Sequence, residues 1–183
     1  MDYKMLAEGD KIAVAVSGGK DSLTLLRILL DRKAFVPIEY DVTAIHIDMG
    51  YPRSISGKLE KYFKKLKVKY RIIKSDILKK TDKDKINCFW CSWNRRKELF
   101  IAANSLGCTK IALIRPLAYV EERLIIRFAR EAKLGHDTCL CPHSVTSNRA
   151  RVGRIIRELE KACPDVKKNI FRSLKRIKQD YLL

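Results

Sequence analysis

One stretch near the start of the chain, residues 11–30 (KIAVAVSGGKDSLTLLRILL), constrains the fold more than any other. It begins with a continuous apolar run at 12–16, which is typical of a strand covered on both faces of a sheet. Two glycines follow, and because glycine has no Cβ, backbone N–H groups there can approach a ligand closely. The apolar spacing after them predicts a helix with one buried side: Leu23, Leu26, Ile28, Leu29 and Leu30. The stretch therefore predicts a strand, a glycine turn and a helix.

A strand that leads through bare backbone into a helix forms an anion site, because free N–H groups and the helix dipole both favour negative charge. Lys20 adds a positive charge, and Asp21 and Ser22 are suited to capping the helix. The anion that fits best is a polyphosphate. The pattern is neither the GxxxxGKS/T of a Walker A loop nor the GxGxxG of a dinucleotide fold, and a turn without function is the alternative interpretation.

Composition limits the class of protein. The 183 residues are 46% hydrophobic, enough for one domain of ordinary size with its own core. No apolar run approaches the ~20 residues that cross a bilayer, and residues 1–10 do not resemble a signal peptide, so we expect a cytoplasmic protein. Lys and Arg number 39 against 21 acids, a net charge of +18. This excess predicts a polyanionic partner, with a merely solvated basic surface as the alternative.

Strand and helix patterns alternate along the rest of the chain, which predicts an α/β fold with a Rossmann-like parallel sheet. We expect further strands at 41–47, 70–73 and 110–113, and helices at 56–66, 93–106, 121–133, 152–162 and 166–181. His46, Ile47 and Asp48 fall at the carboxyl end of the second strand, where open α/β sheets bind ligands. We expect them near the nucleotide, although a packed His46 is the alternative.

Six cysteines suggest metal or redox chemistry, because structural disulfides are rare in cytoplasmic proteins. Cys88 and Cys91 open an expected helix and precede three cations at 95–97, and both features favour the thiolate. A CxxC pair alone fits zinc, iron–sulfur or thiol exchange. Cys139 and Cys141 form a second cluster with the histidines of GHDTCLCPHS at 135–144.

Taken together, these motifs resemble the PP-loop family of tRNA thiolation enzymes, the 2-thiocytidine and 2-thiouridine synthetases. The matching segments are EGDKIAVAVSGGKDS, CFWCSWNRRKELF, IRPLAYVEE and CPHSVTSNRARVGRIIRELEKACPDVKKNIFRSLKRI. The resemblance implies a PP-loop ATP pyrophosphatase domain over 1–143. It also implies a basic helical C-terminal extension over 144–183 that packs on the same domain.

From the resemblance we expect an ATP-dependent sulfurtransferase that adenylates a pyrimidine C2 carbonyl and replaces its oxygen with sulfur. ATP and Mg²⁺ would bind at Ser17, Gly18, Gly19, Lys20, Asp21, Ser22, His46, Ile47 and Asp48. Lys20 would hold the phosphates. Cys88, Cys91 and Cys141 would hold a 4Fe–4S cluster whose open iron carries the sulfur, with zinc as the alternative metal in a crystal grown in air.

The other cysteines have lesser expected roles. Cys139 would be a fourth ligand only if the cluster lacked an open position, Cys108 would pack in the core, and Cys163 would be a bystander. The implied partners are tRNA and a sulfur donor protein or sulfide. A homodimer is one option for assembly, and no membrane is involved.

The chain departs from the family after the fourth strand. There the family continues with a Gly-His-x-x-Asp-Asp loop and a helix that supply a catalytic acid, whereas here Ile114 follows Leu113 at once. Either the chain is a truncated paralogue, or the segment exists and is missing from the numbered residues. We expect the second, with the Cα atoms of Leu113 and Ile114 much further apart than ~3.8 Å.

Other features leave alternatives open. Within the tRNA thiolation family, IRPLAYV resembles the cytidine-modifying branch, whereas the C-terminal portion resembles the uridine-modifying branch. The zinc-binding cysteine clusters that the uridine branch carries at both ends are absent from this sequence. The target base is therefore undecided. A PP-loop ligase of the amide-forming or lysidine type would adenylate its substrate without needing the three cysteines. A degenerate RNA-binding protein with a structural zinc would need no ATP.

Overall fold

The computed structural model describes residues 6–51, 54–76, 87–111, 117, 120–135 and 148–173. The chain divides into two compact units, 1–140 and 141–183. The predicted boundary after residue 143 lies outside the described residues, and the packing of the extension on the first domain stays a prediction. Among the helices that the structure describes, none is long and apolar enough to cross a membrane.

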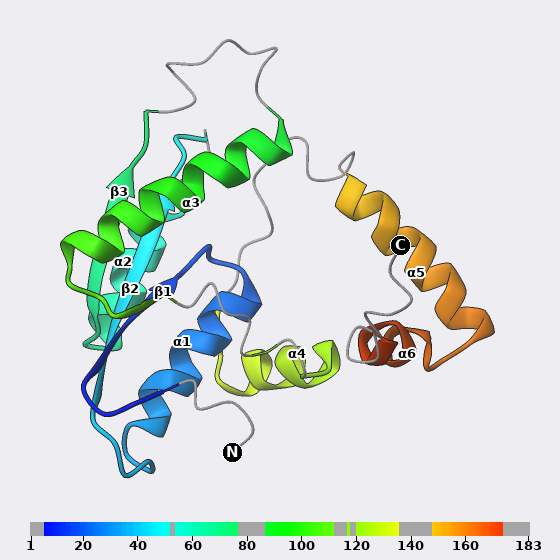
Figure 1. Cartoon of the computed structure of the whole chain (residues 1–183), viewed down its shortest axis with the longest axis horizontal. Helices are drawn as coiled ribbons and strands as arrows, with labels where there is room; N and C mark the ends of the chain where they lie inside the picture. Colours follow the sequence, from blue (N-terminus) through cyan, green and yellow to red (C-terminus); the bar gives the residue numbers. More distant parts are fainter. Residues whose placement is uncertain are drawn as a thin grey trace, which may run out of the picture. The chain divides into compact units, whose positions relative to one another are not determined.

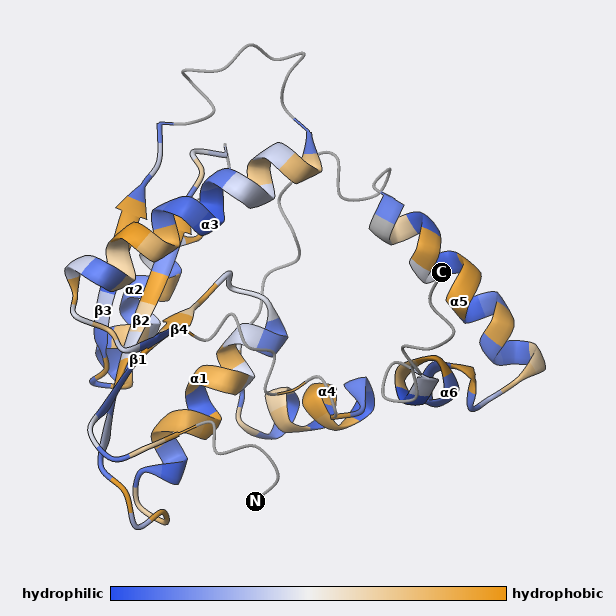
Figure 2. Ribbon diagram, viewed as in Figure 1, coloured by the Kyte–Doolittle hydropathy of each residue, from blue (hydrophilic) through white to orange (hydrophobic). Residues whose placement is uncertain are grey.

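Strands and helices alternate through the first unit, as Figure 1 shows. They are β1 (Asp10–Ala15), α1 (Lys20–Arg32), β2 (Tyr40–Asp48), α2 (Ser56–Lys65), β3 (Lys69–Lys74), α3 (Cys88–Ser105), β4 (Lys110–Ile111) and α4 (Glu122–Glu131). The second unit contains α5 (Asn148–Ala162) and α6 (Val166–Ser173). Figure 2 shows apolar and polar residues alternating along α5, the pattern of an amphipathic helix.

The four strands form a parallel sheet in the order β3-β2-β1-β4, which confirms the predicted fold class. All six residues of β1 pair with β2, in register from Asp10 beside Tyr40 to Ala15 beside Ile45. The chain moves from β1 outward to β3 and then crosses to the other side of β1 to make β4. The order therefore reverses beside the carboxyl end of β1, the position at which open α/β sheets bind ligands.

The two faces of the sheet bury different sets of residues. Because successive strand residues point to opposite faces, Ile12 and Val14 join a core with α1, α2 and α4, while Ala13 faces a core with α3. The first core contains Leu26 and Phe63, both with 0% exposure. Burial on both faces explains why β1 reads as a continuous apolar run rather than an alternating one.

Some details differ from the prediction at the level of single residues. In α1, Leu23, Leu26 and Leu29 are buried as expected, but Ile28 and Leu30 are only half-buried. Leu30, near the end of α1, still packs against the core, although it is not fully covered. Leu124 of α4, expected on the packed side, is 50% exposed.

The sequence is continuous between Leu113 and Ile114, with all 183 residues accounted for. The expectation of a segment missing from the numbering is therefore wrong, and the departure from the family is a property of the chain itself. The predicted separation of the two Cα atoms falls on residues outside those described, as do 136–147, which include Cys139 and Cys141.

Candidate functional site

The glycine turn after β1 accepts only glycine at its first position. Gly18 has φ +84°, a left-handed conformation that side chains rarely adopt. A Cβ at Gly18 would also collide with Cδ1 of Ile55, the residue before α2. The turn and the start of α2 are therefore in close contact at the carboxyl edge of the sheet.

Side chains within the turn hold its shape. The Ser17 N–H donates to Ser22 Oγ at 3.2 Å, and the Ser22 hydroxyl donates to the Gly19 carbonyl at 2.9 Å. The N-cap of α1 is Gly19, and no side chain caps it. The prediction that Asp21 and Ser22 cap this helix is wrong, because the Ser22 hydroxyl is turned back to a carbonyl. A helix start without a side-chain cap keeps its first amides available for an anion.

Lys20, the first residue of α1, is held in place by two carboxylates. Its Nζ lies 2.9 Å from Glu122 Oε1 on α4 and 3.2 Å from Asp21 Oδ1. The hydrogen bond that Lys20 donates to Glu122 is the main reason that the pKa of Lys20 is raised above 10.5. The ammonium group is therefore charged at neutral pH, and it lies at the mouth of the glycine turn.

His46 on β2 supports the entry to the turn. The ring is buried, with 6% exposure, and its Nδ1 lies 2.8 Å from the Val16 carbonyl, immediately before the turn. Burial lowers the pKa of His46 below 6.5, so the ring is neutral at pH 7 and Nδ1–H is the donor. Ile47, the next residue, is buried in the core that contains α3.

Asp48 ends β2 and accepts hydrogen bonds from three sides. Its Oδ2 lies 2.6 Å from both Ser54 Oγ and Ser56 Oγ, and its Oδ1 accepts the Gly50 N–H at 3.0 Å. Burial is the largest effect and raises the pKa of Asp48, but these hydrogen bonds together outweigh it and leave the pKa below 3.8. Asp48 is thus a fixed anion at neutral pH.

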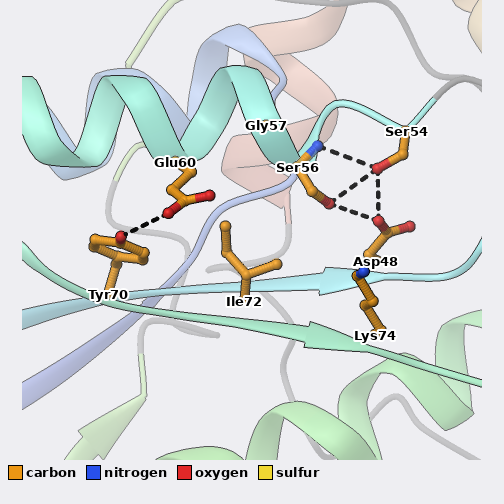
Figure 3. Close-up of a pocket in the computed structure, with 8 residues that line it drawn as sticks. All are labelled: Asp48, Ser54, Ser56, Gly57, Glu60, Tyr70, Ile72 and Lys74. Carbon is orange, nitrogen blue, oxygen red and sulfur yellow. Dashed lines mark hydrogen bonds between the residues drawn. The ribbon is translucent and has the colours of Figure 1, made fainter.

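Asp48 and the two serines form one end of an open pocket of about 610 Å³, seen in Figure 3. At the other end, the Tyr70 hydroxyl donates to Glu60 at 3.1 Å. Sequence reasoning found Asp48 but missed Ser54 and Ser56, although serines just before and at a helix start are a recognisable signal.

The cysteine pair lies in the first turn of α3. Asn87 caps this helix by accepting the Trp90 N–H at 2.9 Å, which fixes where the helix begins. The Cys88 side chain is exposed, whereas Cys91 is half-buried, with its Sγ 3.9 Å from the hydroxyl of Tyr51. Tyr51 follows β2, so the contact joins the carboxyl edge of the sheet to the cysteine helix. Sequence reasoning missed Tyr51.

The remaining cysteines divide by burial. Cys108 packs beside the core that contains α3, and burial raises the pKa of its thiol above 9.0, which disfavours the thiolate. Cys163 is exposed after α5. Within the described part of the chain, no group of three or more His, Cys, Asp or Glu side chains could hold a metal ion. Cys141 lies outside that part, so the predicted three-cysteine set stays a prediction.

No family model matches the chain. The tRNA-cytidine(32) 2-sulfurtransferase of Geobacter sulfurreducens is 34% identical over 225 residues, which cover 100% of this chain and 88% of the relative. The enzyme of the same name from Deinococcus radiodurans is 33% identical, with coverages of 100% and 75%.

The alignment with the Geobacter relative is longer than this chain. It spans 225 residues against 183 here, a difference of 42. The relative therefore contains about this many residues without a counterpart in the present chain.

Two solved structures share the fold. The U34-tRNA thiolase NcsA from Methanococcus maripaludis, solved with its 4Fe–4S cluster, superposes with a TM-score of 0.77 at 22% identity, covering 95% of this chain and 73% of NcsA. The NH₃-dependent NAD synthetase from Campylobacter jejuni gives a TM-score of 0.51 at 13% identity, covering 97% and 82%. At these identities the structures show a common fold.

Proposed function

The chain belongs to the family of tRNA-cytidine(32) 2-sulfurtransferases, and from this premise we propose that it is an ATP-dependent enzyme that thiolates a pyrimidine of tRNA. In the first step, the C2 oxygen of the base attacks the α-phosphate of ATP and pyrophosphate leaves. In the second step, sulfur attacks C2 and AMP leaves with the original oxygen. A sulfur donor protein or sulfide supplies the sulfur atom.

The nucleotide half of this proposal is supported by the glycine turn. The uncapped amides of α1 and the charged Lys20 offer hydrogen bonds and positive charge to the phosphates. Asp48, ionised at the end of β2, is suited to binding Mg²⁺ through an oxygen ligand. His46 positions the entry to the turn by its bond to the Val16 carbonyl.

The sulfur half depends on the cysteines. Cys88 and Cys91 would hold the cluster with Cys141, and when bound the cluster would supply a soft metal to carry the sulfur. The two described donors fit this use, because cysteine sulfurs are the ligands that iron–sulfur sites prefer and both lie in the first turn of α3. Among the described residues, the Tyr51 hydroxyl contacts Cys91 and restrains its side chain.

The single observation that carries the proposal is the contact between Tyr51 and Cys91. Tyr51 belongs to the segment that follows β2 and Asp48, so the contact supports a cysteine pair at the same edge of the sheet as the glycine turn. A base held there could meet both the activating nucleotide and the incoming sulfur.

A second candidate function is a tRNA-binding paralogue that does not catalyse thiolation. It is favoured by the uninterrupted Leu113–Ile114 junction and by the 42-residue difference from the Geobacter relative. The acid that the family resemblance places after the fourth strand has no counterpart at this junction.

Substitution of the cysteines tests the proposal. With tRNA, ATP, Mg²⁺ and a sulfide source under anaerobic conditions, we expect the wild type to form thiolated nucleoside, measured by mass spectrometry of digested tRNA. Cys88→Ala and Cys91→Ala should each lower this activity at least about 100-fold, because each removes a group from the reacting centre. Cys108→Ala is the matched control and should retain activity, since this thiol is packed beside the core.

Each outcome points to one function. Loss of thiolation with Cys88→Ala but release of pyrophosphate at the wild-type rate would support separate adenylation and sulfur steps. Full activity in both cysteine variants would contradict the sulfur role and favour a ligase. A wild type that binds tRNA but neither releases pyrophosphate nor thiolates would establish the non-catalytic paralogue.

A further inference from the structure

We propose that Phe89 and Trp93 form a stacking platform on α3 that binds unpaired bases of the RNA substrate. The inference deepens the proposed function and rests on it, because it assigns residues of the cysteine helix that would bind the tRNA. It concerns an exposed pair of rings that the chemistry proposed above does not use.

The two rings are large, apolar and open to solvent. Phe89 is 77% exposed and Trp93 is 62% exposed, in contrast to the fully buried Phe63. Their centroids lie 6.4 Å apart with an angle of 20° between the ring planes. Positions four residues apart share one side of a helix, so α3 presents the two rings together.

Exposure of this kind calls for a binding partner. Burying an aromatic side chain removes a large apolar area from water, and globular proteins rarely leave such side chains together in water. Flat, nearly parallel rings suit another flat ring better than they suit the irregular side chains of a protein surface. Base stacking on aromatic side chains is the main way in which proteins hold single-stranded RNA.

The positive charge beside the platform favours a polyanionic binding partner. Arg95, Arg96 and Lys97 follow Trp93 after one residue and are exposed, and no acidic residue occurs from Cys88 to Lys97. The whole chain carries a net charge of +18, which attracts a phosphate backbone over a longer range. An apolar protein partner would need no such run of cations. Aromatic rings followed by guanidinium groups are the chemistry that recognises bases and phosphates together.

The platform also lies close to the cysteine pair. Phe89 follows Cys88, and Trp93 is two residues after Cys91, all near the start of α3. At about 1.5 Å of rise per residue, these residues span about 8 Å along the helix axis. At about 100° per residue, however, both rings lie about 160° around the helix from Cys91, so a base stacked on them would lie on a different side of α3 from this thiol. Phe89 and Trp93 would therefore bind the RNA rather than position the reacting base.

Fluorescence gives a direct test, because the chain has only two tryptophans. In a Trp90→Phe variant, Trp93 is the single reporter, and stacking on a base quenches tryptophan emission. We expect a short unpaired pyrimidine RNA oligonucleotide to quench this emission, and a fully paired RNA duplex of equal length to quench it far less. The measurement needs no thiolation, so it can fail or succeed independently of the proposed activity.

Affinity measurements complete the test with an unmodified tRNA transcript. Each ring replaced by alanine, in Phe89→Ala and Trp93→Ala, should weaken binding by about 5- to 150-fold, the range expected for one stacked base. Phe89→Tyr and Trp93→Phe should restore most of it, since they keep a ring. Phe100→Ala is the matched control, because Phe100 is also an exposed phenylalanine of α3 and lies further along the helix from the cysteines. Circular dichroism and thermal unfolding would confirm that each variant folds.

Specific outcomes would overturn the inference. Wild-type affinity for tRNA in both alanine variants would exclude a stacking role. Equal quenching by single-stranded and duplex RNA would indicate phosphate contacts without stacking. Unchanged RNA binding together with loss of self-association in Phe89→Ala would show that the rings form a protein interface instead.

Discussion

A buried histidine at the base of the glycine turn gives the protein a pH-sensitive residue. Burial favours neutral His46, whereas in the unfolded chain the imidazole titrates with a pKa near 6.5. Below that pH the unfolded state therefore binds more protons than the folded state. Stability should consequently fall as the pH drops through 6.5 toward the lower pKa of the folded protein.

This effect can be measured by urea unfolding between pH 7.5 and 5. We expect the free energy of unfolding to fall by up to about 1.4 kcal/mol per pH unit below pH 6.5 from this group alone. A His46→Gln variant, which keeps an N–H donor for the Val16 carbonyl, should have a flatter pH dependence over the same window. The pKa values of Asp10, Asp41 and Asp48 lie below 3.8, so these carboxyls do not titrate there. Identical slopes in both proteins would exclude His46 as the source.

Single-residue roles were only partly accessible from the sequence. The glycines, Lys20 and Asp48 stand out because their chemistry is tied to short local patterns. Tyr51 does not, because it acquires its partner, Cys91, only through the path of the segment after β2. The hydrogen bond from Ser22 to the Gly19 carbonyl likewise reverses the capping role that a local rule assigns to serine.

At the scale of elements, the contact of Gly18 with Ile55 couples β1–α1 to α2. Gly18→Ala would force a Cβ into the left-handed region and against the Ile55 side chain. We expect it to lower the free energy of unfolding by about 1–2 kcal/mol or more. Urea denaturation at neutral pH measures this loss.

Gly57→Ala is the matched substitution with the opposite expected sign. Gly57 lies in the first turn of α2, and an added Cβ would meet nothing within 4 Å. Alanine there should raise the free energy of unfolding by roughly 0.5–1 kcal/mol. Equal effects of the two substitutions would mean that the turn is not sterically restricted.

Most elements could be predicted because their periodicity is strong. In α2, Leu59 and Phe63 lie four residues apart and are both buried, so this pair alone defines the inner face of the helix. Burial within an apolar stripe was harder to predict. Leu124 and Ile125 are adjacent in α4, yet only Ile125 is buried, because the position of the neighbouring helix decides which one is covered.

On the scale of the whole molecule, the net charge and the parallel sheet follow from composition and pattern. The outcome at Leu113 does not, since the residues on either side of this junction do not show whether a segment is missing from the chain or only from the numbering. Only an alignment of 225 residues against 183 makes the difference measurable.

The ion pair between Lys20 and Glu122 links ATP binding thermodynamically to the packing of α4. If ATP phosphates take over the Lys20 ammonium group, they must displace the Glu122 carboxylate from it. ATP binding then weakens the contact between Lys20 and the first turn of α4. By thermodynamic reciprocity, that contact weakens ATP binding by the same free energy. Glu122→Gln should bind ATP more tightly by up to about fivefold, the scale of one partly exposed ion pair, measured by calorimetry.

Glu131→Gln is the control, because Glu131 lies on the same helix but pairs with Arg127. Weaker ATP binding by Glu122→Gln would show instead that the carboxylate assists the nucleotide. In the wild type, added ATP should speed hydrogen exchange in the N-terminal turn of α4. Binding of ATP at the glycine turn would thus loosen the first turn of α4, a helix far from this turn in the sequence.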